Sequence, residues 1–205
     1  MTSATVPKTA FELSDASDWQ IDWQTERLTI RLLQTQDYQV EFGHASNPEI
    51  MRYIADIDDL AAVEAKVRSA FEPWQGKDGE WLLLPIFRTE HQESDGGHIG
   101  MVCLRFESVE FKRVEIGYRL HPNFHGQGYG LEATTALIQF LFEQIKINKV
   151  VAYCVAEHSH SYRLMEKLGM KREGQLRQHS TLSGRWHDEL VYGLLAQEYR
   201  DNFGA

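Results

Sequence analysis

Three glycines at alternate positions constrain the fold of this chain more than any other feature of its sequence. Gly126, Gly128 and Gly130 stand between a strand pattern at residues 114–120 and the helical apolar spacing of residues 130–145. Glycine lets a backbone approach a phosphate closely, and the free N–H groups of a helix's first turn point toward an anion. The segment therefore predicts a phosphate-binding loop. The alternative is a turn that needs glycine only for its backbone geometry.

Two other well-defined phosphate-binding loops do not fit this spacing. A Walker loop ends in Gly-Lys followed by Ser or Thr, whereas Gly130 is followed by Leu131 and Glu132. A Rossmann fingerprint needs G-x-G-x-x-G early in a βαβ unit, and that pattern is not present here. Neither of these two loops is therefore predicted.

The rest of the chain contains further strand and helix patterns, with no internal repeat. Helical spacing marks residues 61–71 and the run Ser161, Leu164, Met165 and Leu168, which Gly169 ends. Strands are predicted at residues 25–33, 81–87, 98–106, 150–156 and 186–195, the second and third forming a hairpin across polar residues 89–97.

Length and composition fit one domain that is preceded by a short arm. The chain has 205 residues, of which 42% are hydrophobic. Residues 1–24 show no sustained period, so we predict an N-terminal arm there, partly docked by Trp19 and Trp23, and a single domain over residues 25–205.

Charge and cysteine content restrict the partners and the compartment. The formal net charge of -9 argues against nucleic acid or an anionic membrane as partner and favours a cationic substrate. No signal-peptide pattern and no apolar run near ~20 residues is found, so we expect a cytoplasmic protein. Cys103 and Cys154 fall in strand patterns and are expected to be buried, reduced thiols. A homodimer is left open.

The glycine segment resembles the pyrophosphate loop of the GNAT superfamily of N-acetyltransferases, Q/R-x-x-G-x-G/A between a strand and a helix. Here it is His125-Gly126-Gln127-Gly128-Tyr129-Gly130, with His125 where Gln or Arg is usual. The resemblance implies that acetyl-CoA binds as co-substrate. Its binding residues would be Leu120, His125, Gly126, Gln127, Gly128, Tyr129 and Gly130, with His158 and Ser161 from a second segment.

That second segment, residues 157–170, is similar to the family's N-x-A-S followed by a helix that ends K-L-G-F. Ser161 matches, as do Lys167, Leu168 and Gly169, while His158 stands where Asn is usual. Ser161 shares the inward stripe of its helix, so its hydroxyl is expected to reach the cofactor or to cap the helix.

Both ends of the domain resemble the branch that includes ribosomal-protein N-terminal acetyltransferases. The matching residues are Thr25 to Leu28 near the start and Gly184 to Asp188 near the end. The resemblance implies a single α+β domain. Its central sheet would be mixed, mostly antiparallel and of about seven strands, flanked by helices and splayed at the acetyl-CoA site.

The chemistry of this family is direct attack of a neutral amine on the thioester, which needs a proton acceptor and an acid for the departing thiolate. Glu115, on the strand before the loop, is the candidate base, with an exposed surface carboxylate as the alternative. Many relatives use a Tyr as this acid, but the matching position here is Met165. Ser161 or a water is therefore the candidate acid, and Tyr162 is left open.

The expected acceptor is a primary amine, either a protein N-terminal α-amine or a small amine. At pH 7 an α-amine of pKa about 7.7 to 8 is roughly a tenth neutral, whereas a lysine amine near 10.4 is about one part in a few thousand. A weak base therefore suffices only for the first.

There are three alternatives to an acetyltransferase that uses no metal, and the first is an enzyme that does. The pairs His158 with His160 and His121 with His125 suggest a metal, but no further ligand completes the spacing, so no metal is expected. The second is a non-catalytic acyl-CoA-binding sensor or interaction module. The third is a phosphate-ligand protein outside the superfamily.

Overall fold

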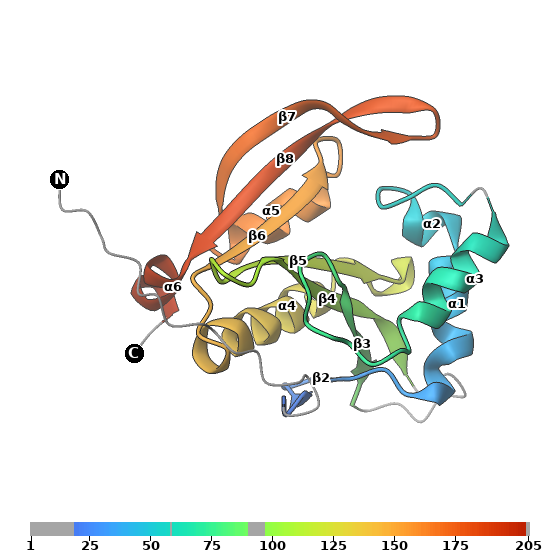
Figure 1. Cartoon of the computed structure of the whole chain (residues 1–205), viewed down its shortest axis with the longest axis horizontal. Helices are drawn as coiled ribbons and strands as arrows, with labels where there is room; N and C mark the ends of the chain where they lie inside the picture. Colours follow the sequence, from blue (N-terminus) through green and yellow to red (C-terminus); the bar gives the residue numbers. More distant parts are fainter. Residues whose placement is uncertain (1–18, 58, 90–96, 204–205) are drawn as a thin grey trace.

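The computed structural model describes residues 19–57, 59–89 and 97–203, which form one layered domain around an eight-stranded sheet (Figure 1). The sheet order is β1-β2-β3-β4-β5-β6-β8-β7, and all neighbours are antiparallel except β5 and β6. The strands are β1 Asp22–Gln24, β2 Leu28–Arg31, β3 Leu82–Arg88, β4 His98–Ser108, β5 Arg113–Leu120, β6 Lys149–Val155, β7 Lys171–Leu182 and β8 Arg185–Leu195.

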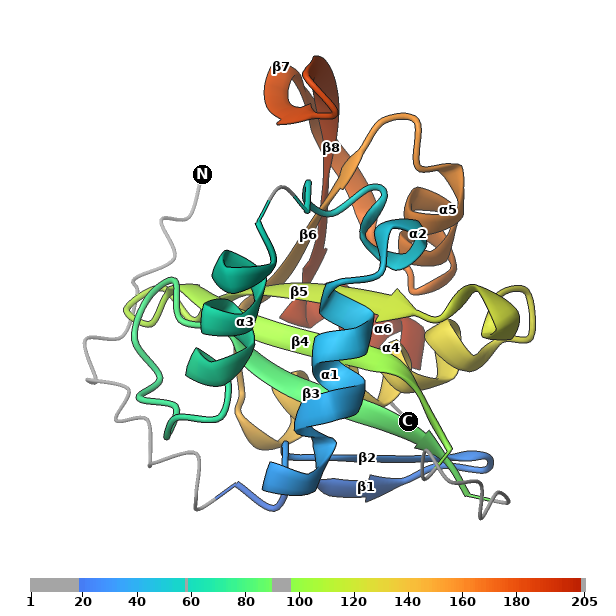
Figure 2. The ribbon, with the colours of Figure 1, turned by 90° about the vertical axis from the view of Figure 1, so that its right-hand side faces the viewer.

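Helices cover both faces of the sheet. Figure 2 shows α1 and α3 in front of β3, β4 and β5, with α4 on the far side. The α-helices are α1 Tyr38–Ala45, α2 Pro48–Met51, α3 Leu60–Ser69, α4 Tyr129–Gln139, α5 Ser159–Lys167 and α6 Ala196–Phe203. Two short 3-10 helices, Thr35–Asp37 and Pro122–Phe124, and a π-helix, Phe140–Gln144, complete the described elements.

The sheet splits between its two parallel strands. β5 and β6 are paired only from Arg113 with Lys149 to Glu115 with Val151. Beyond that point β5 stays paired with β4 as far as Leu120, while β6 stays paired with β8 as far as Val155. The two halves of the sheet therefore diverge, as the family resemblance implied.

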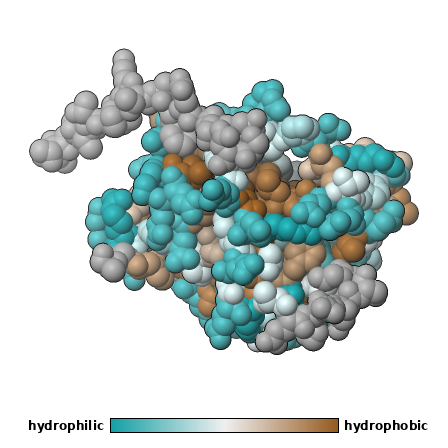
Figure 3. All heavy atoms as spheres, turned by 90° about the horizontal axis from the view of Figure 1, so that it is seen from below, coloured by the Kyte–Doolittle hydropathy of each residue, from teal (hydrophilic) through white to brown (hydrophobic). Residues whose placement is uncertain are grey.

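The core lies between α4 and the strands of the first half of the sheet. Leu84, Leu104 and Val114 are completely buried, and so are Leu137 and Leu141 behind them. The predicted apolar stripe of the helix faces this core, because residues three and four apart share one face. Seen from below, the surface is mostly hydrophilic, with apolar side chains gathered in its centre (Figure 3).

The predicted α+β fold with a mostly antiparallel sheet is confirmed, and three details differ from the prediction. The strand β7 was missed because most of its side chains are polar and exposed, so it lacks an alternating pattern. The helix predicted to run to residue 145 changes after Gln139 into a π-helix. The C-terminal helix α6 was also missed.

Part of the predicted N-terminal arm belongs to the sheet. Trp19 and Ile21 are buried, the rings of Trp19 and Trp23 contact Phe140, and residues 22–24 form the edge strand β1. The sheet gains its eighth strand there. Residues 1–18 of the predicted arm lie outside the described residues.

Leu137→Ala should lower the free energy of unfolding by about 2 to 5 kcal/mol, because a completely buried leucine is replaced by a cavity in the α4 core. Leu60→Ala is the matched control, since Leu60 is also helical but 58% exposed. Urea unfolding of both variants checks this. Similar losses in the two would contradict the described core.

Candidate active site

The predicted phosphate-binding loop connects the end of β5 to the first turn of α4. Gly126 and Gly128 both have left-handed backbones, with φ of 74° and 85°, which glycine adopts without strain. Gly128 is the N-cap of α4, and no side chain caps the helix. The N–H groups of the first turn are therefore left for an anion.

Two glycines of this loop serve different purposes. A Cβ on Gly126 would meet nothing within 4 Å, so the space beside it is open. A Cβ on Gly130 would lie 3.1 Å from a methyl of Leu164 and 3.2 Å from one of Leu120. Gly130 therefore lets the start of α4 pack closely on α5 and β5, while Gly126 leaves room for a ligand.

The polar side chains of the loop turn back onto the protein. The Nε2 atom of His125 lies 3.0 Å from the carbonyl oxygen of Leu120. The Gln127 amide donates to the carbonyl of Asn123 at 2.8 Å. Both side chains brace the loop, so a phosphate would be bound mainly by backbone N–H groups.

The second predicted segment brings Ser161 to Tyr118 across the split in the sheet. Ser161 is 6% exposed, and its Oγ lies 2.9 Å from the Tyr118 hydroxyl, which also donates to the Ser161 carbonyl at 3.0 Å. Burial raises the pKa of Tyr118. The Ser161 hydroxyl thus contacts a phenol, and the N-cap of α5 is His158.

His158 lies at the N-terminus of α5, three residues before Ser161. Its ring stacks on Tyr53 with centroids 4.5 Å apart. Burial, with smaller effects of His160 and His125, lowers the pKa of His158 to about 4, so its imidazole is neutral at pH 7.

A cleft of about 1490 Å³ opens on the face of the sheet covered by α1 and α3. Glu115, Tyr118, His158 and Ser161 line it, whereas residues 120 and 125–130 do not. The structure therefore places the predicted catalytic pair in one cleft and the predicted pyrophosphate loop outside it, after the end of β5.

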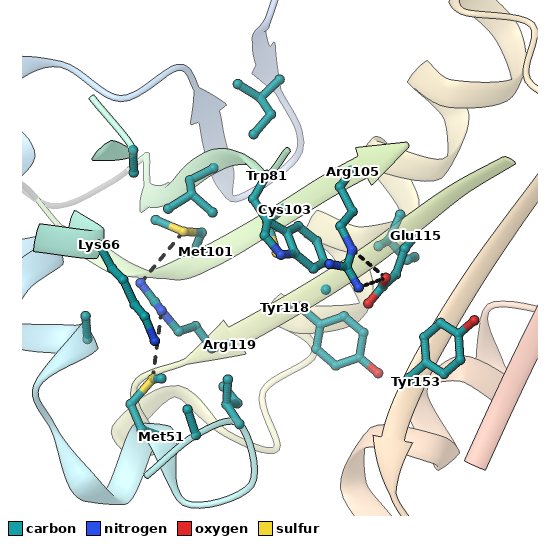
Figure 4. A pocket seen from close by; sticks show the side chains of 18 of the residues that line it. Met51, Lys66, Trp81, Met101, Cys103, Arg105, Glu115, Tyr118, Arg119 and Tyr153 are labelled. Carbon is teal, nitrogen blue, oxygen red and sulfur yellow. Dashed lines mark hydrogen bonds and ion pairs between the residues drawn. The ribbon is translucent and has the colours of Figure 1, made fainter. Parts of the chain in front are cut away.

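Glu115 lies on the floor of this cleft in an ion pair (Figure 4). Both Nε and Nη2 of Arg105 contact its Oε2, at 2.7 and 2.6 Å, and the Arg105 guanidinium lies over the Trp81 ring. Glu115 is 8% exposed, which excludes the alternative interpretation of this residue as an exposed surface carboxylate. Burial raises the pKa of Glu115 even though Arg105 lowers it.

A second ion pair lies deeper in the cleft and was missed by sequence reasoning. Arg119 pairs with Glu41, whose side chain is 2% exposed, and its guanidinium also approaches the sulfur atoms of Met51 and Met101 (Figure 4). The alternation of residues 114–120 places Arg119 on the same face of the strand as Glu115, so the sequence pattern could have predicted Arg119 as a second residue of the site. Nothing comparable pointed to Glu41.

The β7–β8 hairpin lines one side of the cleft. Both carboxylate oxygens of Asp56 accept from the backbone N–H of Ser183 at the hairpin tip, at 2.9 Å. A bulge between Leu176 and Ser180, fixed by a 2.9 Å hydrogen bond from the Gln178 N–H to Asp188, places His179 in the lining.

The described part of the chain holds neither a metal-binding cluster nor a membrane-spanning helix. Within residues 19–57, 59–89 and 97–203, no group of three or more His, Cys, Asp or Glu side chains is arranged to hold a metal ion. Over the same residues, no helix is long and apolar enough to cross a membrane.

Residues 27–171 match the acetyltransferase (GNAT) domain family. The chain therefore belongs to this family of acetyltransferases, and the predicted class, an N-acetyltransferase, is confirmed.

Its relatives cover most of its length. The uncharacterized N-acetyltransferase YnaD of Bacillus subtilis is 28% identical over 180 residues, covering 85% of this chain and 97% of that protein. The [ribosomal protein uS5]-alanine N-acetyltransferase of Escherichia coli is 25% identical and covers 77% and 97%.

Solved structures share the fold. A GNAT-family acetyltransferase from Bacillus anthracis has a TM-score of 0.71 at 25% identity, covering 85% of this chain and 98% of that one. The spermidine N-acetyltransferase of Vibrio cholerae, in complex with CoA and spermine, has a TM-score of 0.72 at 18% identity, covering 85% and 99%.

Arg119→Met should lower the free energy of unfolding by about 3 to 5 kcal/mol at pH 7, because Glu41 is left as an unpaired buried charge. Burial already raises the pKa of Glu41, and losing Arg119 raises it further. Stability of the variant should thus be regained as the pH falls and Glu41 takes up a proton.

Urea unfolding at pH 5 and pH 8 checks this, with Arg119→Met/Glu41→Gln as the control that removes the stranded charge. A loss in Arg119→Met that does not depend on pH, or that the second substitution does not reduce, would contradict the account.

Proposed function

We propose that this enzyme transfers the acetyl group of acetyl-CoA to a primary amine by direct attack. The observation that carries the proposal is the loop of Gly126, Gly128 and Gly130, whose open backbone lies between the end of β5 and an uncapped helix N-terminus. A diphosphate carries the charge that such a helix end favours. The split between β5 and β6 opens along β5, the same strand that leads into this loop.

The residues present fit acetyl-CoA as the acyl donor. Backbone N–H groups of residues 126–130 would bind its diphosphate, with Leu120 and His158 at the two sides of the split. Acetyl-CoA supplies an activated acyl group as a thioester. In the reaction a nitrogen–carbon bond forms, the carbon–sulfur bond breaks, the amine loses a proton and the thiolate gains one.

Glu115 is the proposed base, acting directly or through a water. It lines the cleft and its raised pKa makes it a better proton acceptor than an exposed carboxylate. Arg105 contacts Oε2 through both Nε and Nη2, so Oε1 would be the atom that accepts the proton.

Ser161 is the proposed acid, and Tyr118 is the partner that sequence reasoning missed. The two hydroxyls are 2.9 Å apart in the lining of the cleft, so a proton can pass between them. Tyr162, left open from the sequence, does not line the cleft. Tyr118 therefore supplies a phenol to the cleft that is also lined by Met165, the position where many relatives carry a tyrosine.

The acceptor enters through the cleft, whose charge favours a cation. Among the lining residues, acidic side chains outnumber basic ones: Glu41, Asp56, Glu72, Glu80, Glu107, Glu115 and Glu189 against Lys66, Arg105 and Arg119. Two of the proteins named above are named for their acceptors, one for a ribosomal-protein alanine and the other for spermidine. Both classes, a protein N-terminal α-amine and a small amine, fit a cleft of this size and charge.

Gly128→Glu should abolish acetyl-CoA binding, because it places a carboxylate on the backbone that would bind the diphosphate. Calorimetric titration with acetyl-CoA measures the affinity. Gly184→Glu is the matched control: Gly184 also has a positive φ, 68°, with nothing near its Cβ, but it lies at the hairpin tip. Unchanged affinity in Gly128→Glu would refute the loop assignment.

Glu115→Gln should lower kcat by about 10²- to 10⁴-fold and leave the affinity for acetyl-CoA unchanged, since it removes only the proton acceptor. The wild-type rate should fall as the pH drops through the raised pKa of Glu115, and this acidic limb should be lost in the variant. Free-thiol release measured across pH checks both. A variant with the wild-type pH profile would remove Glu115 as the base.

A further inference from the structure

A turn near the start of the chain is tied to the first turn of α4. Thr25 and Arg27, in the turn between β1 and β2, both bind the carboxylate of Glu132. The Thr25 hydroxyl donates to Oε1 at 2.5 Å, and the backbone N–H of Arg27 donates to the same atom at 2.9 Å. The Arg27 side chain contacts Oε2 through Nε at 2.8 Å and Nη2 at 2.6 Å.

The same guanidinium also contacts the glycine loop. Its Nη1 donates to the carbonyl of Gln127 at 3.0 Å, and its Cζ lies 4.5 Å from the centre of the Tyr129 ring. A Cβ on Gly128 would come within 3.3 Å of Nη2. Arg27 therefore lies against three consecutive residues of the loop, from a position 100 residues away in the chain.

The turn that carries Arg27 is itself fixed to the sheet. The Arg27 carbonyl accepts from the N–H of Thr89, just after β3, at 3.0 Å, and the Thr25 N–H donates to the Leu28 carbonyl at 2.9 Å. Leu28 is completely buried. The loop is thereby linked to the core of the sheet through one side chain.

The charge of Glu132 needs this partner. A bare carboxylate in the first turn of α4 would compete with a diphosphate for the positive end of the helix. Burial alone would raise the pKa of Glu132, but its hydrogen bonds to Thr25 and Arg27 lower it overall, so it is ionised and paired. The pair adds no net charge and keeps the carboxylate turned toward Arg27.

We propose that Arg27, with Glu132, is a positioning residue of the cofactor loop, which fixes the backbone of residues 126–130 for the diphosphate of CoA. The inference rests on the proposed function. It also gives a physical role to Thr25 and Arg27, which belong to the segment Thr25 to Leu28 that resembles the family. His125 replaces the Gln or Arg that is usual at the first position of the loop, and its ring is turned back onto the Leu120 carbonyl. The cation beside the loop comes instead from Arg27.

The test compares acetyl-CoA with S-acetylpantetheine, which carries the same thioester arm without the diphosphate. Arg27→Gln should raise KM for acetyl-CoA about tenfold or more, because the charge-assisted hydrogen bond to the Gln127 carbonyl and the cation–π contact with Tyr129 are both lost. Its kcat, and its kcat/KM with S-acetylpantetheine, should match wild type. A general structural defect would instead affect both donors.

Arg113→Gln is the matched control. Arg113 pairs with Glu107 at side-chain exposures of 41% and 17%, nearly those of Arg27 and Glu132, 42% and 17%, but lies at the start of β5. Its KM for acetyl-CoA should not change. If Arg27→Gln does not fold, Glu132→Gln tests the same proposal. Its KM should also rise for acetyl-CoA, while its kcat/KM with S-acetylpantetheine should match wild type.

The double variant Arg27→Gln/Glu132→Gln separates positioning from charge balance. It is predicted to recover only the part of the loss that the bare Glu132 carboxylate causes and to bind acetyl-CoA more weakly than wild type, because the link to the loop is still absent. Recovery of the full wild-type affinity in the double variant would overturn positioning in favour of charge compensation. Wild-type KM in Arg27→Gln, or equal losses with both donors, would also overturn it, whereas no binding by the wild type would refute the proposed function itself.

Discussion

The short parallel pairing of β5 with β6 is the constraint on which the rest of the site depends. The two strands are joined only at Arg113 to Glu115 and Lys149 to Val151, and each then follows its antiparallel neighbour. Ending the ladder early leaves backbone groups of two central strands without sheet partners, which a compact domain tolerates where a ligand or side chains can satisfy them.

Side chains from both halves of the sheet meet at this split. Tyr118 leaves the β5 half and reaches Ser161, at the start of the helix that follows β6. Glu115, the last residue of β5 that pairs with β6, lies where the parallel pairing stops. The glycine loop continues from the same strand into α4. One interruption of the sheet thus brings together the groups proposed for donor binding and for proton transfer.

Two ion pairs hold the acceptor side in place. Arg105 and Glu115 face each other in the register of β4 and β5, so the sheet itself sets their separation. Arg119 and Glu41 connect β5 to α1. Removing one member of such a pair strands the other charge in a poorly solvated place, and the four residues therefore act as two units.

The sequence was informative where a local pattern determines structure and silent where distant residues meet. Gly126, Gly128 and Gly130 predicted the loop because their need for left-handed backbones and close packing is local. The exposed strand β7 has no buried face, so no periodicity marked it. The contacts of Tyr118 with Ser161 and of Arg27 with Glu132 depend on strand register and helix placement, which spacing along the chain does not encode.

The central claim is that this chain moves an acetyl group from CoA to an amine. The most direct measurement is calorimetric titration of the wild-type protein with acetyl-CoA, followed in the same samples by free-thiol release and by the mass of each amine in a panel of N-terminal peptides and small amines. The account predicts saturable binding, and one thiol released for each acetyl group gained by an acceptor. Binding without thiol release would instead indicate a non-catalytic acyl-CoA sensor, and no binding would contradict the assignment of the glycine loop and the proposed function with it.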